Sequence, residues 1–114
     1  MLTVDALKSF GANTEEGMAR CLNREDFYLR LVKTVPGEPN FEKLEKAIAD
    51  GDLDAGFEAA HSLKGVLSNL SLTPISEPVG KMTELLRARE QADYSELLAE
   101  TLKQRDILKS LCEG

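Results

Sequence analysis

Residues 52–70 read DLDAGFEAAHSLKGVLSNL, and the interpretation of the whole chain starts from this stretch. Asp52 stands where a helix N-cap is expected, and the apolar residues after it recur at helical spacing. When His61 is set at zero on a wheel of about 100° per residue, one apolar stripe falls near the opposite pole. The residues of this stripe are Gly56, Ala59, Leu63, Val66, Leu67 and Leu70. We therefore expect a helix over about 53–70 that buries this stripe in a core.

The opposite face of this helix carries His61, the single histidine of the chain, and the wheel directs it toward solvent. Lys64 follows at i+3, where its ammonium group can neutralise a phosphate. Gly65 lies beside them, although a glycine inside a helix costs about 1 kcal/mol relative to alanine. Such a glycine is explained if a partner protein approaches the imidazole closely. The residues predicted to dock a partner are Phe57, Glu58, Lys64, Gly65 and Ser68.

Capping and breaking residues divide the preceding sequence into further helices. Thr3 and Asn13 are expected to cap two short helices. Asn23 is expected to open the next helix, which Pro36 and Pro39 interrupt. The helix after these prolines ends at a glycine, position 51, and its apolar stripe is Phe41, Leu44, Ile48 and Ala49.

The helix that follows residue 70 has two possible starts. Thr73-Pro74 provides one, while Ser76 as the N-cap places Pro78 in the first turn and is the better fit. The apolar residues of this helix are Val79, Met82, Leu85 and Leu86. Residues 93–96 have the spacing of a capping box, which opens a last helix that carries Leu97, Leu98, Leu102, Leu108 and Leu111.

Short connections between consecutive helices favour antiparallel neighbours, and no segment shows the sustained alternation of a strand. We therefore predict an all-α fold, an antiparallel four-helix bundle with additional short helices at the N-terminus. One domain is expected over 1–114, because this length suits a single domain. Within it, the bundle core is expected at about 23–112 and the short helices at about 3–21.

Composition argues against several classes of function. A net charge of −6 disfavours binding to nucleic acid or to an anionic membrane. Cys21 and Cys112 are far apart in the sequence and have no metal-ligand spacing with His61, so we expect reduced thiols, no metal and no cofactor. The N-terminus does not resemble a signal peptide, and no apolar run is long enough to span a bilayer. These features predict a cytoplasmic protein.

The stretch Ala60-His61-Ser62-Leu63-Lys64-Gly65 resembles the signature of histidine-containing phosphotransfer (Hpt) domains, the intermediate carriers of bacterial phosphorelays. The similarity extends over about residues 23–110. The chain departs from the family at Val66 and Leu67, where small residues are usual, and at Ser68 and Ser71, where glycine is common.

The resemblance implies that His61 accepts a phosphoryl group from the aspartyl phosphate of one receiver domain and passes it to another, with Lys64 acting on the phosphate. It implies response-regulator receiver domains and a hybrid sensor histidine kinase as partners, with Mg²⁺ held by the receiver. An exposed imidazole suits this role because it is mostly neutral near pH 7 and offers an unprotonated nitrogen. Either ring nitrogen can be the nucleophile.

Other interpretations fit parts of the sequence. A non-phosphorylated helical-bundle adaptor that binds and inhibits a receiver or sensor kinase would have nearly the same residues. A sensor kinase also carries a phosphorylated histidine on a helix, but an acidic residue typically follows it where this chain has Ser62, and there is no glycine-rich nucleotide loop. We therefore expect a phosphocarrier rather than an enzyme. A monomer is the default, because the bundle can close its own core, and Met1 suits a free-standing chain.

Overall fold

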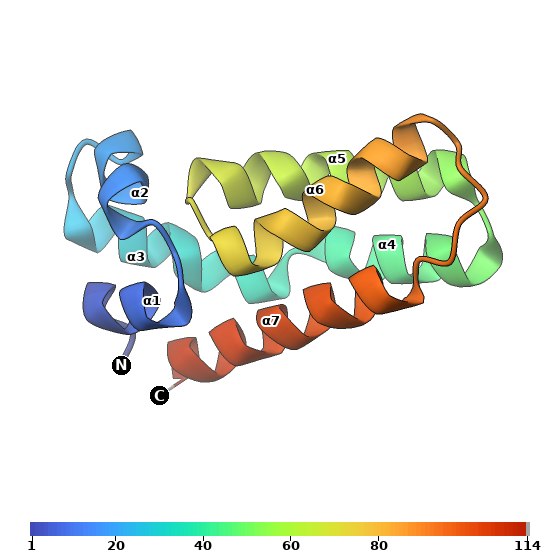
Figure 1. The fold of residues 1–114 in the computed structure, drawn as a ribbon. Helices are drawn as coiled ribbons and strands as arrows, with labels where there is room; N and C mark the ends of the chain where they lie inside the picture. The colour runs from blue at the N-terminus through green and yellow to red at the C-terminus, as the bar shows by residue number, and fades with distance from the viewer. Residues whose placement is uncertain (114) are drawn as a thin grey trace.

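The computed structural model describes residues 1–113, which form helices with no strand in that range. The four longer helices are α4 (Pro39–Asp50), α5 (Leu53–Asn69), α6 (Thr73–Arg87) and α7 (Ser95–Glu113). Figure 1 shows that each of them is antiparallel to the one before it. Helix α5 packs between α4 and α6, and α6 also packs on α7. The all-α, four-helix bundle predicted from the sequence is confirmed.

Shorter helices precede α4. Two of them, α1 (Val4–Phe10) and α2 (Thr14–Arg20), lie where short N-terminal helices were predicted. The other two, α3 (Glu25–Thr34) and the 3₁₀ helix η1 (Val35–Gly37), lie within the range that was predicted for the bundle core. Two predicted caps are confirmed, because Thr3 Oγ1 and Asn13 Oδ1 each accept a hydrogen bond from a first-turn N–H, at 3.0 and 3.1 Å. The predicted break is also present: Pro36 lies in η1, and Pro39 opens α4.

The short helices cover the end of the bundle where α5 turns into α6 (Figure 1). The Asn13 N–H donates to the Ser71 carbonyl at 3.0 Å, and the Ser71 hydroxyl donates to Glu16 Oε1 at 3.1 Å. From α3, the buried Tyr28 donates its hydroxyl to the Leu70 carbonyl at 2.9 Å. These hydrogen bonds attach α2 and α3 to the C-terminal end of α5.

The Tyr28 hydroxyl is expected to stabilise the protein. Tyr28→Phe leaves the Leu70 carbonyl without this donor, so we expect the free energy of unfolding to fall by about 1–2 kcal/mol in urea denaturation at pH 7. Burial raises the pKa of Tyr28 to about 12, because it disfavours the charged phenolate. The stability difference between the two proteins should therefore shrink as the pH rises from about 10 toward 12, since the unfolded wild-type chain ionises first. A difference that stays constant over this range would contradict the assignment.

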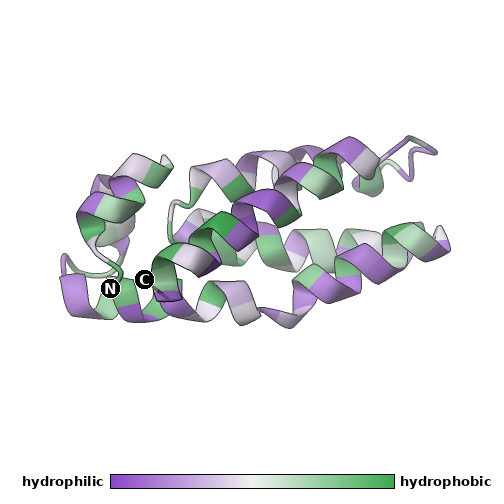
Figure 2. Ribbon diagram, turned by 90° about the horizontal axis from the view of Figure 1, so that it is seen from below, coloured by the Kyte–Doolittle hydropathy of each residue, from purple (hydrophilic) through white to green (hydrophobic). Residues whose placement is uncertain are grey.

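The core is built from the apolar faces of amphipathic helices, which Figure 2 shows as hydrophobic segments alternating with hydrophilic ones. In α5 the predicted stripe is confirmed, with Ala60 as an additional member and Val66 only half-buried. In α4 the prediction is wrong at Ala49, which is exposed, whereas Ala47 is buried. Ala47 comes three residues after Leu44 and therefore shares its face of the helix.

One predicted helix start is wrong, and the structure selects between the two possible starts of α6. Asn23 does not cap α3, which begins two residues later; Asn23 has a φ of 55° and lies in the preceding turn. Of the two possible starts of α6, the helix has the one at Thr73-Pro74 and not the one after Ser76, so Pro78 lies inside the helix. The cause is burial, because residue 75 belongs to one continuous buried face. That face consists of Ile75, Pro78, Val79, Met82, Thr83 and Leu86.

Helix α7 begins within the predicted 93–96 stretch, but its cap differs from the predicted capping box. Asp93 Oδ1 accepts hydrogen bonds from the Ser95 N–H at 2.9 Å and from the Ser95 hydroxyl at 2.6 Å. These hydrogen bonds favour the carboxylate and lower the pKa of Asp93. The cap therefore acts through Ser95 rather than Glu96.

Candidate functional site

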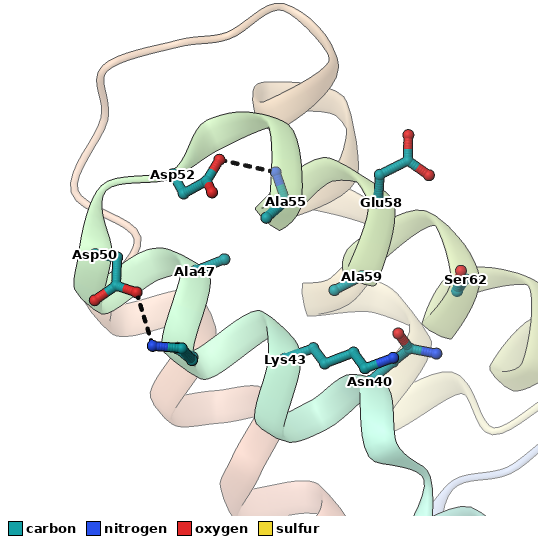
Figure 3. Close-up of a pocket in the computed structure, with 10 residues that line it drawn as sticks. Asn40, Lys43, Ala47, Asp50, Asp52, Ala55, Glu58, Ala59 and Ser62 are labelled. Carbon is teal, nitrogen blue, oxygen red and sulfur yellow. Dashed lines mark hydrogen bonds and ion pairs between the residues drawn. The ribbon is translucent and has the colours of Figure 1, made fainter.

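His61 lies in the middle of α5, and its side chain is exposed on the face opposite the buried stripe. The start of α5 fixes which residues share that face. Figure 3 shows the Asp52 carboxylate capping this start, where it accepts a hydrogen bond from the Ala55 N–H at 3.0 Å. The imidazole is consequently accessible from solvent while the helix beneath it is held in the core.

The imidazole of His61 stacks on Phe57, one turn earlier in α5. The two ring centroids are 5.5 Å apart, and the ring planes differ by 17°. Phe57 is half-buried against the core, and the guanidinium carbons of Arg87 and Arg89 each lie 5.2 Å from its centroid. Phe57, which was predicted to dock a partner, thus contacts the imidazole and two cations.

The Lys64 ammonium extends toward α6. Its Nζ lies 3.8 Å from Glu84 Oε1, and Arg87 engages the same carboxylate, with Nε 3.6 Å from Glu84 Oε2. One carboxylate of α6 therefore pairs with a cation from α5 and a cation from its own helix.

The sequence did not predict the contribution of α6 to this surface. Arg89, just after the helix, places its Nε 2.7 Å from Asp54 Oδ1 and so fixes the end of α6 on the start of α5. The sequence contained one usable signal, the basic pair Arg87 and Arg89 at the end of α6. A short connection makes α6 antiparallel to α5, which places this pair near the start of α5. Glu84 gave no such signal.

Gly65 is exposed, and a Cβ added there would have no atom from outside its own turn within 4 Å. Gly17 in α2 is different, because a Cβ there would approach the Leu70 carbonyl oxygen to 2.8 Å. Packing thus explains the glycine in α2, whereas nothing in residues 1–113 requires a glycine at position 65.

Replacing Gly65 with alanine is expected to stabilise the protein by about 1 kcal/mol, because alanine has the higher helix propensity and the space is open. Gly17→Ala serves as the matched variant and is expected to destabilise it, since its methyl group collides with backbone. Both changes are measured by urea denaturation. Destabilisation by Gly65→Ala would show that this glycine serves the fold.

A groove lies on each side of the exposed face of α5. One, of about 460 Å³, separates α4 from α5, and Glu58 and Ser62 lie along its α5 side (Figure 3). The other, of about 700 Å³, is lined by residues of α5, α6 and α7, which include Lys64 and Ser68. The predicted docking residues Glu58, Lys64 and Ser68 therefore border grooves, and Gly65 lies on the same face of α5.

Within residues 1–113, the cysteines and acidic side chains form no metal-binding cluster. Cys21 is buried and Cys112 is half-buried, and both are free thiols. Among residues 1–113, no three His, Cys, Asp or Glu side chains are grouped so that they could hold a metal ion. In the same range, no helix combines the length and the apolar character needed to cross a membrane.

The exposed histidine lies in the part of the chain that matches a known protein family. A family model described as "Hpt domain" matches residues 37–113, more than half of the chain. The matched range contains α4–α7 with His61, while α1–α3 precede it. Searches of curated proteins and of solved structures gave no significant match.

Proposed function

The chain belongs to the histidine-containing phosphotransfer (Hpt) domain family, phosphocarriers of two-component signalling without kinase activity, and we propose that His61 is its phosphoacceptor. The protein accepts a phosphoryl group from one receiver domain and passes it to another. Its partners are the receiver domains of response regulators and a hybrid sensor histidine kinase. The observation that carries this proposal is the exposed imidazole of His61, placed within the family match beside an open glycine.

In the proposed step, an unprotonated nitrogen of the His61 imidazole attacks the phosphorus of a receiver's aspartyl phosphate. The N–P bond forms as the P–O bond to the aspartate breaks, and the electron pair of that bond leaves with the aspartate carboxylate. The other imidazole nitrogen keeps its proton. Transfer to the next receiver runs through the same atoms in reverse.

The residues around His61 have supporting roles in this step. Phosphoryl transfer depends mainly on positioning and charge stabilisation. Phe57 limits the orientations of the imidazole, because the two rings stack at 5.5 Å. Lys64, one turn after His61, neutralises charge on the transferred group. The receiver supplies Mg²⁺, so this chain needs no cofactor of its own.

The docking surface for receivers consists of Phe57, Glu58, Lys64, Gly65 and Ser68. The open space over Gly65 and the two flanking grooves support this assignment, since a bulky side chain there would keep a partner away from the imidazole. The protein works as a monomer in the cytoplasm, where its receivers are expected.

Phosphotransfer profiling tests the proposal. The protein is mixed with each phosphorylated receiver domain of its source organism, and the phosphate is followed by mass spectrometry. We expect an acid-labile, base-stable phosphoryl group on His61 from a subset of the receivers. A protein that binds a receiver but accepts no phosphate would instead support the non-phosphorylated adaptor, which inhibits a receiver or a kinase.

A further inference from the structure

Glu84 places one carboxylate between two cations next to the proposed phosphoacceptor. Its Oε1 is 3.8 Å from Lys64 Nζ, and its Oε2 is 3.6 Å from Arg87 Nε. A carboxylate and a phosphoryl group bind the same kind of cationic partner, because both present negatively charged oxygens to N–H donors. In the unmodified protein, Glu84 therefore occupies cations that a phosphoryl group on His61 would also attract.

These ion pairs are open to exchange. The side chains of Lys64, Arg87 and Glu84 are 42%, 52% and 63% exposed. Ion pairs in this environment contribute little free energy, since water solvates the separated charges almost as well. A phosphoryl group carries nearly two negative charges and three acceptor oxygens, so it can compete with a single carboxylate for the same cations.

Phe57 contacts both Arg87 and the imidazole of His61. The Arg87 guanidinium lies 5.2 Å from the Phe57 centroid, and the imidazole of His61 stacks on the same ring at 5.5 Å. The flexible Arg87 side chain and the imidazole are thus held around the same ring, and Arg87 can exchange the Glu84 carboxylate for another anion. Lys64 has comparable freedom, because its ammonium is on a flexible four-carbon stem.

We propose that Glu84 is an internal counter-ion, which holds Lys64 and Arg87 while His61 is unmodified and yields both cations to the phosphoryl group after transfer. This inference rests on the proposed function. Glu84 lowers the affinity of the protein for the phosphoryl group, and so it favours delivery to the next receiver. It is a positioning residue, because it acts through the two cations and does not touch the reacting atoms.

A competition between two proteins measures this effect directly. Wild type and Glu84→Gln, made with tags of different mass, exchange phosphoryl groups through a trace of one receiver domain until their distribution is constant. Both proteins equilibrate with the same receiver, so the receiver's own affinity for phosphate cancels from the ratio of phosphate on Glu84→Gln to phosphate on wild type. We expect the Glu84→Gln protein to hold about two to five times as much phosphate as wild type, the range that corresponds to one exposed ion pair. The tags are then exchanged and the measurement is repeated.

Two matched proteins separate the counter-ion from a general effect of charge. Glu77→Gln removes the same charge from an exposed position of α6 and should leave the ratio near one. In an Arg87→Met background, the effect of Glu84→Gln should shrink, because one of its two partners is missing. Circular dichroism checks that each variant is folded.

The outcomes distinguish this inference from the proposed function. If wild type accepts phosphate on His61 but Glu84→Gln gives a ratio of one, the counter-ion role is wrong and the phosphocarrier stands. An equal shift from Glu77→Gln, or an undiminished effect in the Arg87→Met background, also overturns the counter-ion role. If wild type takes no phosphate on His61, the proposed function fails, and the counter-ion role fails with it.

Discussion

His61→Gln is expected to abolish phosphoryl acceptance. Glutamine keeps a polar side chain at the position, but its amide nitrogen has no free lone pair to attack phosphorus. The chain has no second histidine that could take over. Incubation with a phosphorylated receiver should therefore leave the variant unlabelled, as read by mass spectrometry under alkaline conditions that preserve phosphohistidine.

The same variant must remain folded for this result to have meaning. Because His61 is exposed, its replacement should change the free energy of unfolding by no more than about 0.5 kcal/mol. The helical circular dichroism signal should match that of wild type. A folded variant that still accepts labelled phosphate would show that the acceptor is another residue.

Gly65→Glu is expected to slow transfer from a receiver by about 100-fold or more. The open space around position 65 lets the isolated bundle accommodate the new side chain. On docking, however, the side chain separates the two reacting groups, and a displacement of only about 1 Å can cost this factor in rate.

A small phosphoryl donor distinguishes blocked docking from damaged chemistry. Phosphoramidate reaches the imidazole without a protein surface, so Gly65→Glu should accept phosphate from it at nearly the wild-type rate. The matched Gly65→Ala protein should retain most of its transfer from the receiver, because a methyl group adds little bulk. Normal transfer in Gly65→Glu would show that the exposed glycine has no steric role.

Helix α5 was predictable because its local signals agree with its burial. Asp52 caps it, its apolar residues follow one helical period, and the same stripe is buried in the bundle. The direction of the His61 side chain follows from that period. The exposed histidine and the open glycine beside it were thus accessible from the sequence.

Helix starts were hard to predict where a local signal competes with burial. Ser76 and Pro78 together look like a helix start, yet burying Ile75 extends α6 back to Thr73. Asn23 looks like a cap, but it takes a left-handed conformation in the turn before α3, which asparagine tolerates better than most residues. Ser71 also has a φ of 55°, a conformation that favours glycine.

The ion pairs around His61 could not be predicted from the sequence. Whether Lys64 meets Glu84 depends on the axial stagger and rotation of α6 against α5. That stagger is set by how the two buried faces interlock, which helical periodicity does not specify. The position of Phe57 beneath two guanidinium groups depends on the same packing.

The single exposed face of α5 has a kinetic consequence for the proposed relay. Donor and acceptor receivers need the same imidazole, so no ternary complex of the carrier with both is productive. The relay must then follow a ping-pong cycle, in which the first receiver dissociates before the second one binds. Throughput is therefore limited by residence time as well as by chemistry, and weak, short-lived complexes serve such a carrier better than tight ones.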